Sequence, residues 1–432
     1  MDKTTTTNPF AKLLKTLSKV EQHEIRATAI SFAMVMILMT SYYILRPVRD
    51  AMASDWSDAE VSLLWTINFL FSFAIVAFYG FAAARVSLNR LVPGVFSFFA
   101  LTFVIFYLVS HLITDSTLID KAFYVWVSVY SLFPISVFWS FMADIYRREQ
   151  SKRLFGIITT GASVGAMIGP SVALLFADLG TYNLMLVATV VLLMTLPLVI
   201  YLRTVDFTSQ SADASPSGNL TPLSNDALAG SKLFFSNPFL IAIGIFLFLY
   251  TGIGSFIYFE LKNLMAEFSR EQRTEIWAFI DLATNSITII AGLFITSRLA
   301  TRLGLGFTLA LLPLVVFAGL LSVAMVPLLS VVIGLQIFRR GGNYAITRPA
   351  REMLFTYVDK ETRFKAKQVI DIIVYRGGDV FWGWAFTFLT AVIGLGVAGV
   401  ALVGAGIAAV WAMLGLYLGN YTKSLDNKHR AD

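Results

Sequence analysis

The sequence predicts an all-α polytopic membrane protein, with twelve transmembrane helices in two six-helix halves. Three observations lead to this prediction. Hydrophobic residues make up 57% of the 432 residues and charged residues only 14%, whereas a soluble domain carries about 25% charged residues. Apolar runs near the spanning length of about 20 residues recur along the chain. A long polar segment, 204–232, divides these runs six and six.

The predicted helices follow the apolar runs in order. The first run, Ala27 to Leu45, is 19 residues without a charge, which is long enough to span and too long for a typical cleavable signal. Two longer uncharged stretches each hold two spans, which we divide at Pro327 and near Gly394 and Gly396. The predicted spans are 28–50, 61–84, 91–110, 122–143, 154–177, 182–202, 237–260, 276–297, 304–326, 328–350, 367–389 and 396–420.

The positive charges predict the orientation of these spans. If the N-terminus is cytoplasmic, 23 Lys and Arg lie in inside segments, 6 in outside loops and 4 within or at the ends of spans. Cytoplasmic loops carry such an excess, so we expect both termini in the cytoplasm. The net charge of +6 is then a consequence of topology, and no nucleic-acid partner is needed to explain it.

The chain therefore divides into five predicted segments. The linker is rich in Ser, Asp, Asn and Pro, which is typical of flexible, solvated chain. An offset of 212 residues aligns Gly165 with Gly377 and Ile158 with Ile370, as a six-helix repeat would. The segments are a cytoplasmic N-terminal segment 1–26 with an amphipathic surface helix over 10–20, the N-terminal half 27–203, the linker 204–232, the C-terminal half 233–421 and a cytoplasmic tail 422–432. This plan resembles that of major facilitator transporters, in which the first and fourth helices of each half line a central cavity.

Composition argues against several other functions. The chain has no Cys and only 3 His, so neither thiol chemistry nor a metal site is predicted. No Gly-x-x-x-x-Gly-Lys-Ser/Thr loop is present, so ATP hydrolysis is not implied. His111 with Asp115 is the only hint of an enzyme, and a helix cap explains that pair. We expect no cofactor. The expected partners are the lipid bilayer and a small solute, and the protein is compatible with a monomer.

One charged phrase occurs twice, in helices predicted to run in opposite directions. The copies are Arg46-Pro47-Val48-Arg49-Asp50 and Arg348-Pro349-Ala350-Arg351-Glu352. Charges within spans cost at least about 2.5 kcal/mol each on insertion scales, so each is a functional candidate. The repeat indicates paired gates around a central site.

Helix order predicts which charges form the gates. Arg49 and Glu260 end the first and seventh helices outside, and Asp144 and Arg351 end the fourth and tenth inside. We expect each pair to form one gate, opening in alternation. Static anchoring of helix ends is the alternative. It explains Arg46, Asp50, Lys262 and Arg348 equally well, because long side chains snorkel to the interface.

Arg339 and Arg340 are the strongest local indication of a binding site within the membrane. Arg339 lies 12 residues after Pro327, about 18 Å deep at the helical rise. A guanidinium fork suits phosphate or carboxylate, so we expect one arginine to face the cavity and the other a neighbouring helix. Asp281 and Asp379 are the alternative, structural partners.

Two further stretches carry signals in or near the membrane. Arg376-Gly377-Gly378-Asp379 is interpreted as a second pair, with Asp371 one helical face away. Gly161, Gly165 and Gly169, followed by Pro170, have the spacing that lets helices pack closely. The same run also resembles the helix-five motif of major facilitator antiporters.

Several stretches resemble the ATP/ADP translocases of plastids and obligate intracellular bacteria, in a branch typical of free-living bacteria. They are Tyr42–Asp50, Phe138–Asp144, Glu149–Gly156, Pro349–Asp359 and Lys365–Asp371. The resemblance implies that Arg49, Asp144, Glu260 and Arg351 take part in nucleotide exchange. The family has Lys at the first and last of these positions and Glu at the second, so this chain departs from its pattern.

The sequence thus predicts a secondary transporter in a bacterial inner membrane that exchanges anionic, phosphorylated metabolites, with ATP and ADP implied by the resemblance. Tyr42, Tyr43, Tyr258 and Tyr344 are candidates for stacking on a base, although packing explains them as well. The alternative is a proton-coupled transporter of another organic anion or a peptidoglycan fragment. In that case carboxylates among Asp144, Glu260, Asp281, Asp371 and Asp379 titrate during transport.

Overall fold

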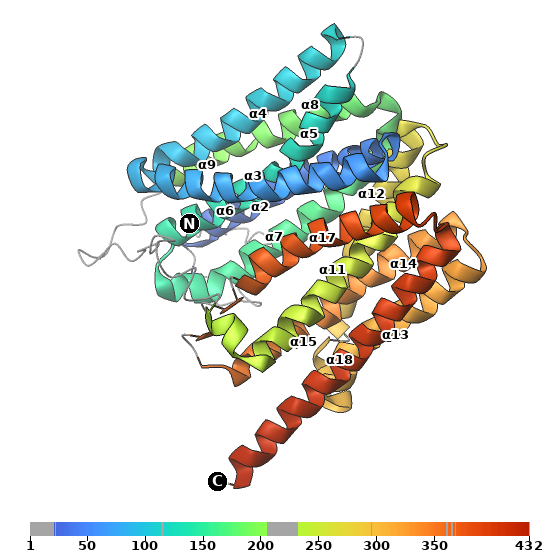
Figure 1. The fold of residues 1–432 in the computed structure, drawn as a ribbon. Coiled ribbons are helices and arrows are strands. Elements are labelled where there is room, and N and C mark those ends of the chain that lie inside the picture. The colour runs from blue at the N-terminus through green and yellow to red at the C-terminus, as the bar shows by residue number, and fades with distance from the viewer. Residues whose placement is uncertain are drawn as a thin grey trace, which may run out of the picture. The chain divides into compact units, whose positions relative to one another are not determined.

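The computed structural model describes residues 21, 23–113, 116–204, 232–294, 296–359, 362–363, 366–367 and 369–431. The predicted surface helix over 10–20 and nearly all of the predicted linker lie outside this part of the chain. Within it, every regular element is a helix (Figure 1). The all-α prediction is confirmed.

A helix, or helices separated by a short break, occupies each of the twelve predicted spans. The first six spans are α2 (Ile25–Met52), α3 (Asp58–Arg85), α4 (Leu88–Leu112), α5 (Thr117–Tyr130) with α6 (Phe133–Ile145), α7 (Arg148–Leu175), and α8 (Thr181–Leu193) with α9 (Thr195–Thr204). The last six are α11 (Pro238–Leu264), α12 (Arg270–Phe294), α13 (Thr296–Met325), α14 (Leu329–Gly342) continued by η3 (Asn343–Thr347) and α15 (Arg348–Leu354), α17 (Tyr375–Thr387) between η5 (Val369–Val374) and η6 (Phe388–Val392), and α18 (Val397–Ala431). Short 3₁₀ turns are η1 (Ala53–Asp55), η2 (Ala177–Leu179) and η4 (Phe355–Tyr357).

Both predicted turns within the long uncharged stretches are confirmed. Pro327 lies in the gap between α13 and α14. Gly394, between η6 and α18, has a φ of +78°, which glycine adopts without the steric penalty of a side chain. Gly304, the predicted start of the ninth span, has a φ of +76° inside α13 and kinks that helix.

Four predicted spans depart from the continuous α-helices that the sequence analysis expected, and in the eleventh, α17 has a π-helical segment on each side, η5 and η6. The fourth span breaks before α6, whose first turn contains Pro134, and proline lacks the N–H that a continuous helix would use. The sixth breaks at Met194, between α8 and α9. The tenth widens into a π-helical turn, η3, directly after Gly341 and Gly342. Such turns often occur at functional sites.

Nine helices of the described residues are long and apolar enough to cross a membrane. The predicted eighth, tenth and eleventh spans are not among them. They carry charges in α12, the adjacent Arg339 and Arg340 in α14, and Arg376 with Asp379 in α17. Large apolar side chains are exposed along the helices, including Leu175 at 75% and Val190 at 58%, as expected of a surface that faces lipid.

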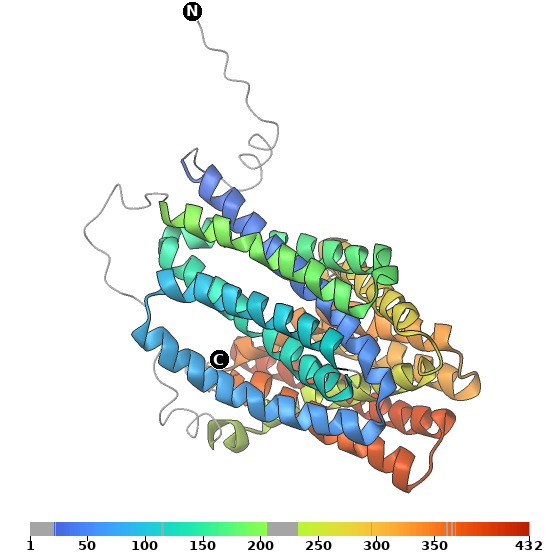
Figure 2. The ribbon, with the colours of Figure 1, turned by 90° about the horizontal axis from the view of Figure 1, so that it is seen from above.

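The helices form two compact units. Unit 1 comprises Met1–Arg49, Ser72–Asn219 and Arg270–Phe279, and unit 2 comprises Asp50–Phe71, Leu220–Ser269 and Ile280–Asp432. In unit 1, α4 lies beside α8 in both views (Figures 1 and 2). In unit 2, α13 lies beside α18 and α11 contacts α14, α17 and α18 (Figure 1). Each unit thus includes a short segment from the other half of the sequence.

The glycines of α7 allow the predicted close packing within unit 1. A Cβ on Gly161 would lie 2.5 Å from the Phe32 carbonyl oxygen, and one on Gly165 would lie 2.2 Å from that of Met36. Both carbonyls belong to α2. A side chain at either position would clash with backbone, so the close-packing interpretation of the glycine spacing is confirmed.

Candidate functional site

Arg339 and Arg340 lie in the last turn of α14, and their side chains point in different directions. Consecutive side chains on an α-helix point about 100° apart, at 3.6 residues per turn. Both are buried, with 6% and 4% of their surfaces exposed. Their surroundings within unit 2 differ.

Arg340 is a structural residue. Its Nη2 lies 2.6 Å from Oδ1 of Asp281 on α12, and the two side chains are 5% and 2% exposed. A buried ion pair of this kind neutralises two charges that would otherwise be very costly inside the unit. The prediction that one arginine faces a neighbouring helix holds for Arg340, and Asp281 is its partner.

Arg339 is held without a carboxylate. Its Nε and Nη2 donate to Oε1 of Gln336, at 3.1 and 3.0 Å. Its guanidinium carbon lies 5.3 Å from the ring centre of Tyr250 on α11. It has no ion pair with any described residue. A buried guanidinium held by an amide oxygen and an aromatic face keeps its positive charge for a further anion.

Gly254 makes room for this arginine. A Cβ at Gly254 on α11 would lie 2.8 Å from Nη1 of Arg339. Any larger residue would force the guanidinium to move. The sequence analysis did not single out Gln336, Tyr250 or Gly254, because their role depends on how α11 packs against α14.

A second group of polar residues lies close to Arg339. Asp379 on α17 is within electrostatic range of Arg339 and Arg376. The predicted pair of Arg376 with Asp379 is not formed, and neither residue has an ion pair with another described residue. Gly378 of the same motif instead packs against α11, where a Cβ would lie 2.4 Å from the Thr251 hydroxyl. Packing of the backbone, rather than pairing of the charges, explains the glycine.

Arg351 joins a network at the end of α15. Its Nη2 lies 3.3 Å from Oε1 of Glu352 and 3.2 Å from Oδ1 of Asp371. Glu352 also contacts Lys367, at 2.5 Å. Burial opposes ionisation of Glu352, but the hydrogen bond and charge of Lys367, and then Arg351, lower its pKa. Arg348, one turn earlier, is exposed.

The corresponding phrase on α2 is divided between the two units along the chain, with Arg49 assigned to unit 1 and Asp50 to unit 2. Arg49 donates to the Ser128 hydroxyl at 3.2 Å and lies 5.5 Å from the ring centre of Tyr124. Arg46 lies over Tyr43, at 5.8 Å. Asp50, 2% exposed, accepts a hydrogen bond from Tyr258 at 3.4 Å. For Tyr258, this bond favours the packing interpretation over base stacking.

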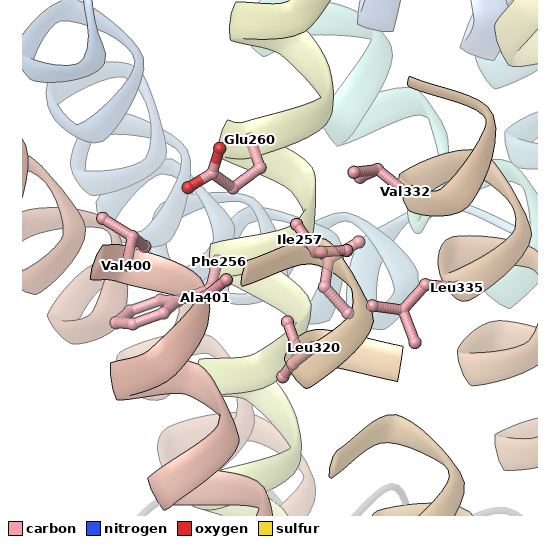
Figure 3. Close-up of a pocket in the computed structure, with 9 residues that line it drawn as sticks. Phe256, Ile257, Glu260, Leu320, Val332, Leu335, Val400 and Ala401 are labelled. Carbon is pink, nitrogen blue, oxygen red and sulfur yellow. The ribbon is translucent and has the colours of Figure 1, made fainter. Parts of the chain in front are cut away.

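Asp144 and Glu260 are acidic residues that differ in burial. Asp144, near the end of α6, is exposed. Glu260 on α11 is 5% exposed and has no hydrogen bond or ion pair among the described residues of its unit. It lies at a small pocket that is lined otherwise by apolar side chains of α11, α13, α14 and α18 (Figure 3). The predicted gate pairs join residues assigned to different units, and they stay predictions.

The structure reveals two ion pairs that the sequence analysis missed. In unit 2, buried Lys262 contacts Asp58 at 2.9 Å and donates to the Trp56 carbonyl oxygen at 2.9 Å. In unit 1, Arg270 contacts buried Asp120 at 2.8 Å. Each pair joins one half of the sequence to the other. The predicted topology places all four residues on the outside, at the end of the seventh span or in outer loops, but no local pattern indicates which charges meet.

These features define a helical, multi-pass membrane transporter. Within unit 2, buried charged side chains lie on α11, α12 and α14, and large apolar side chains are exposed along the helices of the described residues. The chain matches the Major Facilitator Superfamily over residues 31–357, and it belongs to that family. A search of curated protein sequences finds no match.

Solved transporters share the fold. A bacterial homologue of the human lysosomal transporter Spinster, in an inward-facing and unoccupied conformation, is 13% identical, with a TM-score of 0.61, and the match covers 93% of this chain and 98% of that one. The nucleoside transporter NupG is 13% identical, with a TM-score of 0.64, covering 92% and 99%. At this identity the similarity establishes the fold alone.

Proposed function

We propose that the protein is a secondary transporter that exchanges anionic, phosphorylated metabolites, most simply nucleotides, across a bacterial inner membrane. The observation that carries the proposal is Arg339. A buried guanidinium without a carboxylate partner, fixed by Gln336 and Tyr250, is suited to bind a phosphate oxygen. Arg340 is already neutralised by Asp281 and is not assigned to the substrate.

The resemblance to ATP/ADP translocases supports the choice of nucleotides. It covers the Arg46–Asp50 phrase, the end of α6 and the α15 region. The NupG structure, which is that of a nucleoside transporter, supports the same choice only through its fold.

The gating residues complete the proposal. Arg49 and Glu260 are proposed to form the outer gate, and Asp144 and Arg351 the inner one. When the site is empty, the acidic residues would pair with the arginines and oppose conversion of the empty carrier, which enforces exchange. Within unit 2, Arg351 already has acidic contacts in Glu352 and Asp371, so a substrate phosphate would compete with carboxylates for this arginine.

One observation favours a second candidate function, proton-coupled transport of an organic anion. Glu260 is a buried carboxylate with apolar neighbours and no partner in its unit. Ionisable groups inside membrane helices commonly serve as proton relays. Transport driven by a pH gradient without a counter-substrate would favour this candidate over exchange.

Counterflow in proteoliposomes tests the proposal. Vesicles are loaded with ADP, labelled ATP is added outside, and uptake is compared with that of empty vesicles. We expect uptake that requires internal ADP and falls about 10- to 100-fold in Arg339→Gln, since a charged hydrogen bond to substrate contributes about 1.5–3 kcal/mol. Lys423→Gln removes one exposed positive charge on α18 and should match the wild type. Absence of counterflow from a folded, reconstituted protein would reject nucleotide exchange.

A further inference from the structure

Five side chains of unit 2 gather on four neighbouring helical segments near Arg339. The Arg339 cluster consists of Tyr250 on α11, Arg339 on α14, Tyr344 on η3, and Tyr375 and Asp379 on α17. The ring centres of Tyr250 and Tyr375 are 6.5 Å apart, and the Arg339 guanidinium lies over Tyr250. Tyr344 is within electrostatic range of both other tyrosines.

The polar groups of this cluster have unused hydrogen-bonding capacity. The three tyrosine hydroxyls and the Asp379 carboxylate form no hydrogen bond or ion pair with any described residue. Tyr344 and Tyr375 are exposed and Asp379 is half-buried, and no side-chain oxygen of the cluster is among the fully buried atoms that lack a partner. Asp281 and Asp371, also on membrane helices, are each in contact with an arginine. The hydroxyl and carboxylate groups of the cluster are therefore accessible and available to hydrogen-bond a ligand.

The cluster also presents opposite charges that do not neutralise each other. Arg339 and Asp379 are close enough to interact electrostatically but form no ion pair with each other. Tyr344 and Tyr375 are 39% and 37% exposed, so the cluster is open on one side. A site with a free cation, a free carboxylate and exposed aromatic faces fits a ligand with complementary groups at both ends and a flat body between them.

We propose that the Arg339 cluster binds an amphoteric substrate. Arg339 binds its anionic group, and Asp379 accepts a hydrogen bond from an amino group of the same molecule. The tyrosine rings contact the flat part between these groups. This inference rests on the proposed function. It adds that Asp379 recognises a second group on the substrate, besides the anionic group that binds Arg339. For a nucleotide, that group is the amino group of the base.

A site built to accept a hydrogen bond rejects an analogue that lacks the donor, because its own acceptor is then left unpaired. The matched probes are ADP and purine riboside 5′-diphosphate, which lacks the 6-amino group and has no ring N–H. Binding to the purified full-length protein is measured by titration calorimetry in detergent. We expect the wild type to bind ADP at least about tenfold more tightly than the analogue.

Three variants separate the roles. Asp379→Asn should reduce the preference for ADP to under about threefold while the analogue still binds, since an amide is a weaker acceptor than a carboxylate. Arg339→Gln should weaken both ligands. Asp426→Asn, which alters an exposed carboxylate on α18, should behave as the wild type. A thermal unfolding curve for each variant checks that it is folded.

The outcomes distinguish the two proposals. Equal binding of ADP and the analogue by the wild type, or an unchanged preference in Asp379→Asn, overturns the role of Asp379 and leaves nucleotide transport standing. If neither ligand binds the wild type, both the nucleotide proposal and the amphoteric site are rejected.

Discussion

Neighbouring residues of the same type have different roles in this protein. Arg339 and Arg340 are adjacent, equally charged and almost equally buried. Arg340 has a carboxylate in contact, whereas Arg339 has an amide oxygen and an aromatic ring. Helical geometry separates the two directions, and the neighbouring helices supply the different partners.

The Arg340–Asp281 pair predicts a large effect on stability. Asp281→Asn leaves a buried guanidinium without its counter-charge, and we expect the free energy of unfolding to fall by about 3–5 kcal/mol. The double variant Asp281→Leu/Arg340→Met should recover most of this loss, because apolar residues of similar volume often replace a buried pair at little cost. Thermal unfolding in detergent measures both. A single variant as stable as the wild type would show that the pair is not desolvated.

Glu24 predicts a pH dependence at the start of α2. Burial opposes its ionisation, but hydrogen bonds from the Glu21 N–H and Gln150, with the charge of Arg153, lower its pKa below the usual 4.5. A carboxyl group with a lowered pKa in the folded state stabilises the protein above its unfolded pKa, and this contribution is lost as the pH falls through the folded value. Glu24→Gln should therefore be less stable at neutral pH, and its difference from the wild type should shrink below pH 4.5. Unfolding curves across that range test the sign; a constant difference would contradict it.

At the scale of single elements, glycine determines how closely helices pack. The α7 glycines bring that helix against the backbone of α2. On α14, glycines make room for side chains of α12 and α13: a Cβ at Gly341 would lie 3.0 Å from the Ile287 side chain, and one at Gly342 would lie 2.7 Å from that of Leu312. These contacts hold the helix that carries Arg339.

Gly165→Ala tests the α7 contact. The added methyl group would meet the Met36 carbonyl oxygen at 2.2 Å, and overpacking of this kind costs about 1–3 kcal/mol. Gly156→Ala on the same helix has no atom within 4 Å of its Cβ and should be neutral or stabilising, because alanine favours helix by about 1 kcal/mol. Equal stability of the two variants would show that α7 can move away from α2 without cost.

At the scale of the whole molecule, the sequence halves do not coincide with the two compact units. Residues 50–71 belong to unit 2 and 270–279 to unit 1. The Asp58–Lys262 and Asp120–Arg270 pairs lie in these exchanged segments. We therefore expect that polypeptides cut between residues 204 and 232 are stable only when co-expressed. Separate halves that each purify as folded, monodisperse proteins would contradict this.

The absence of cysteine makes the predicted orientation directly testable. Ala59→Cys lies at the start of α3, on the predicted outer face, and Ser424→Cys lies on α18, on the predicted inner face; both positions are exposed. A membrane-impermeant maleimide should label the first in intact cells and the second only after lysis. The reverse pattern would overturn the positive-inside assignment.

The sequence alone determined the fold class and most helix positions. Apolar runs of spanning length require helices because a bilayer offers no partners to exposed backbone groups, and Pro327 and Gly394 mark turns that local chemistry dictates. The breaks in the fourth and sixth spans and the π-helical segments of the tenth and eleventh spans were not predicted, because hydropathy does not register a local change in backbone geometry.

Only the tertiary structure decided which charges meet. The sequence identified Arg339, Arg340, Asp281 and Asp379 as candidates, and the packing of α11, α12, α14 and α17 separated the paired ones from the unpaired ones. It also revealed Gln336, Gly254 and Asp58, whose types are unremarkable in sequence. The physical reason is that a charge within a predicted span indicates only that its burial in the membrane is costly in free energy. Which residue neutralises it depends on contacts between residues far apart in the chain.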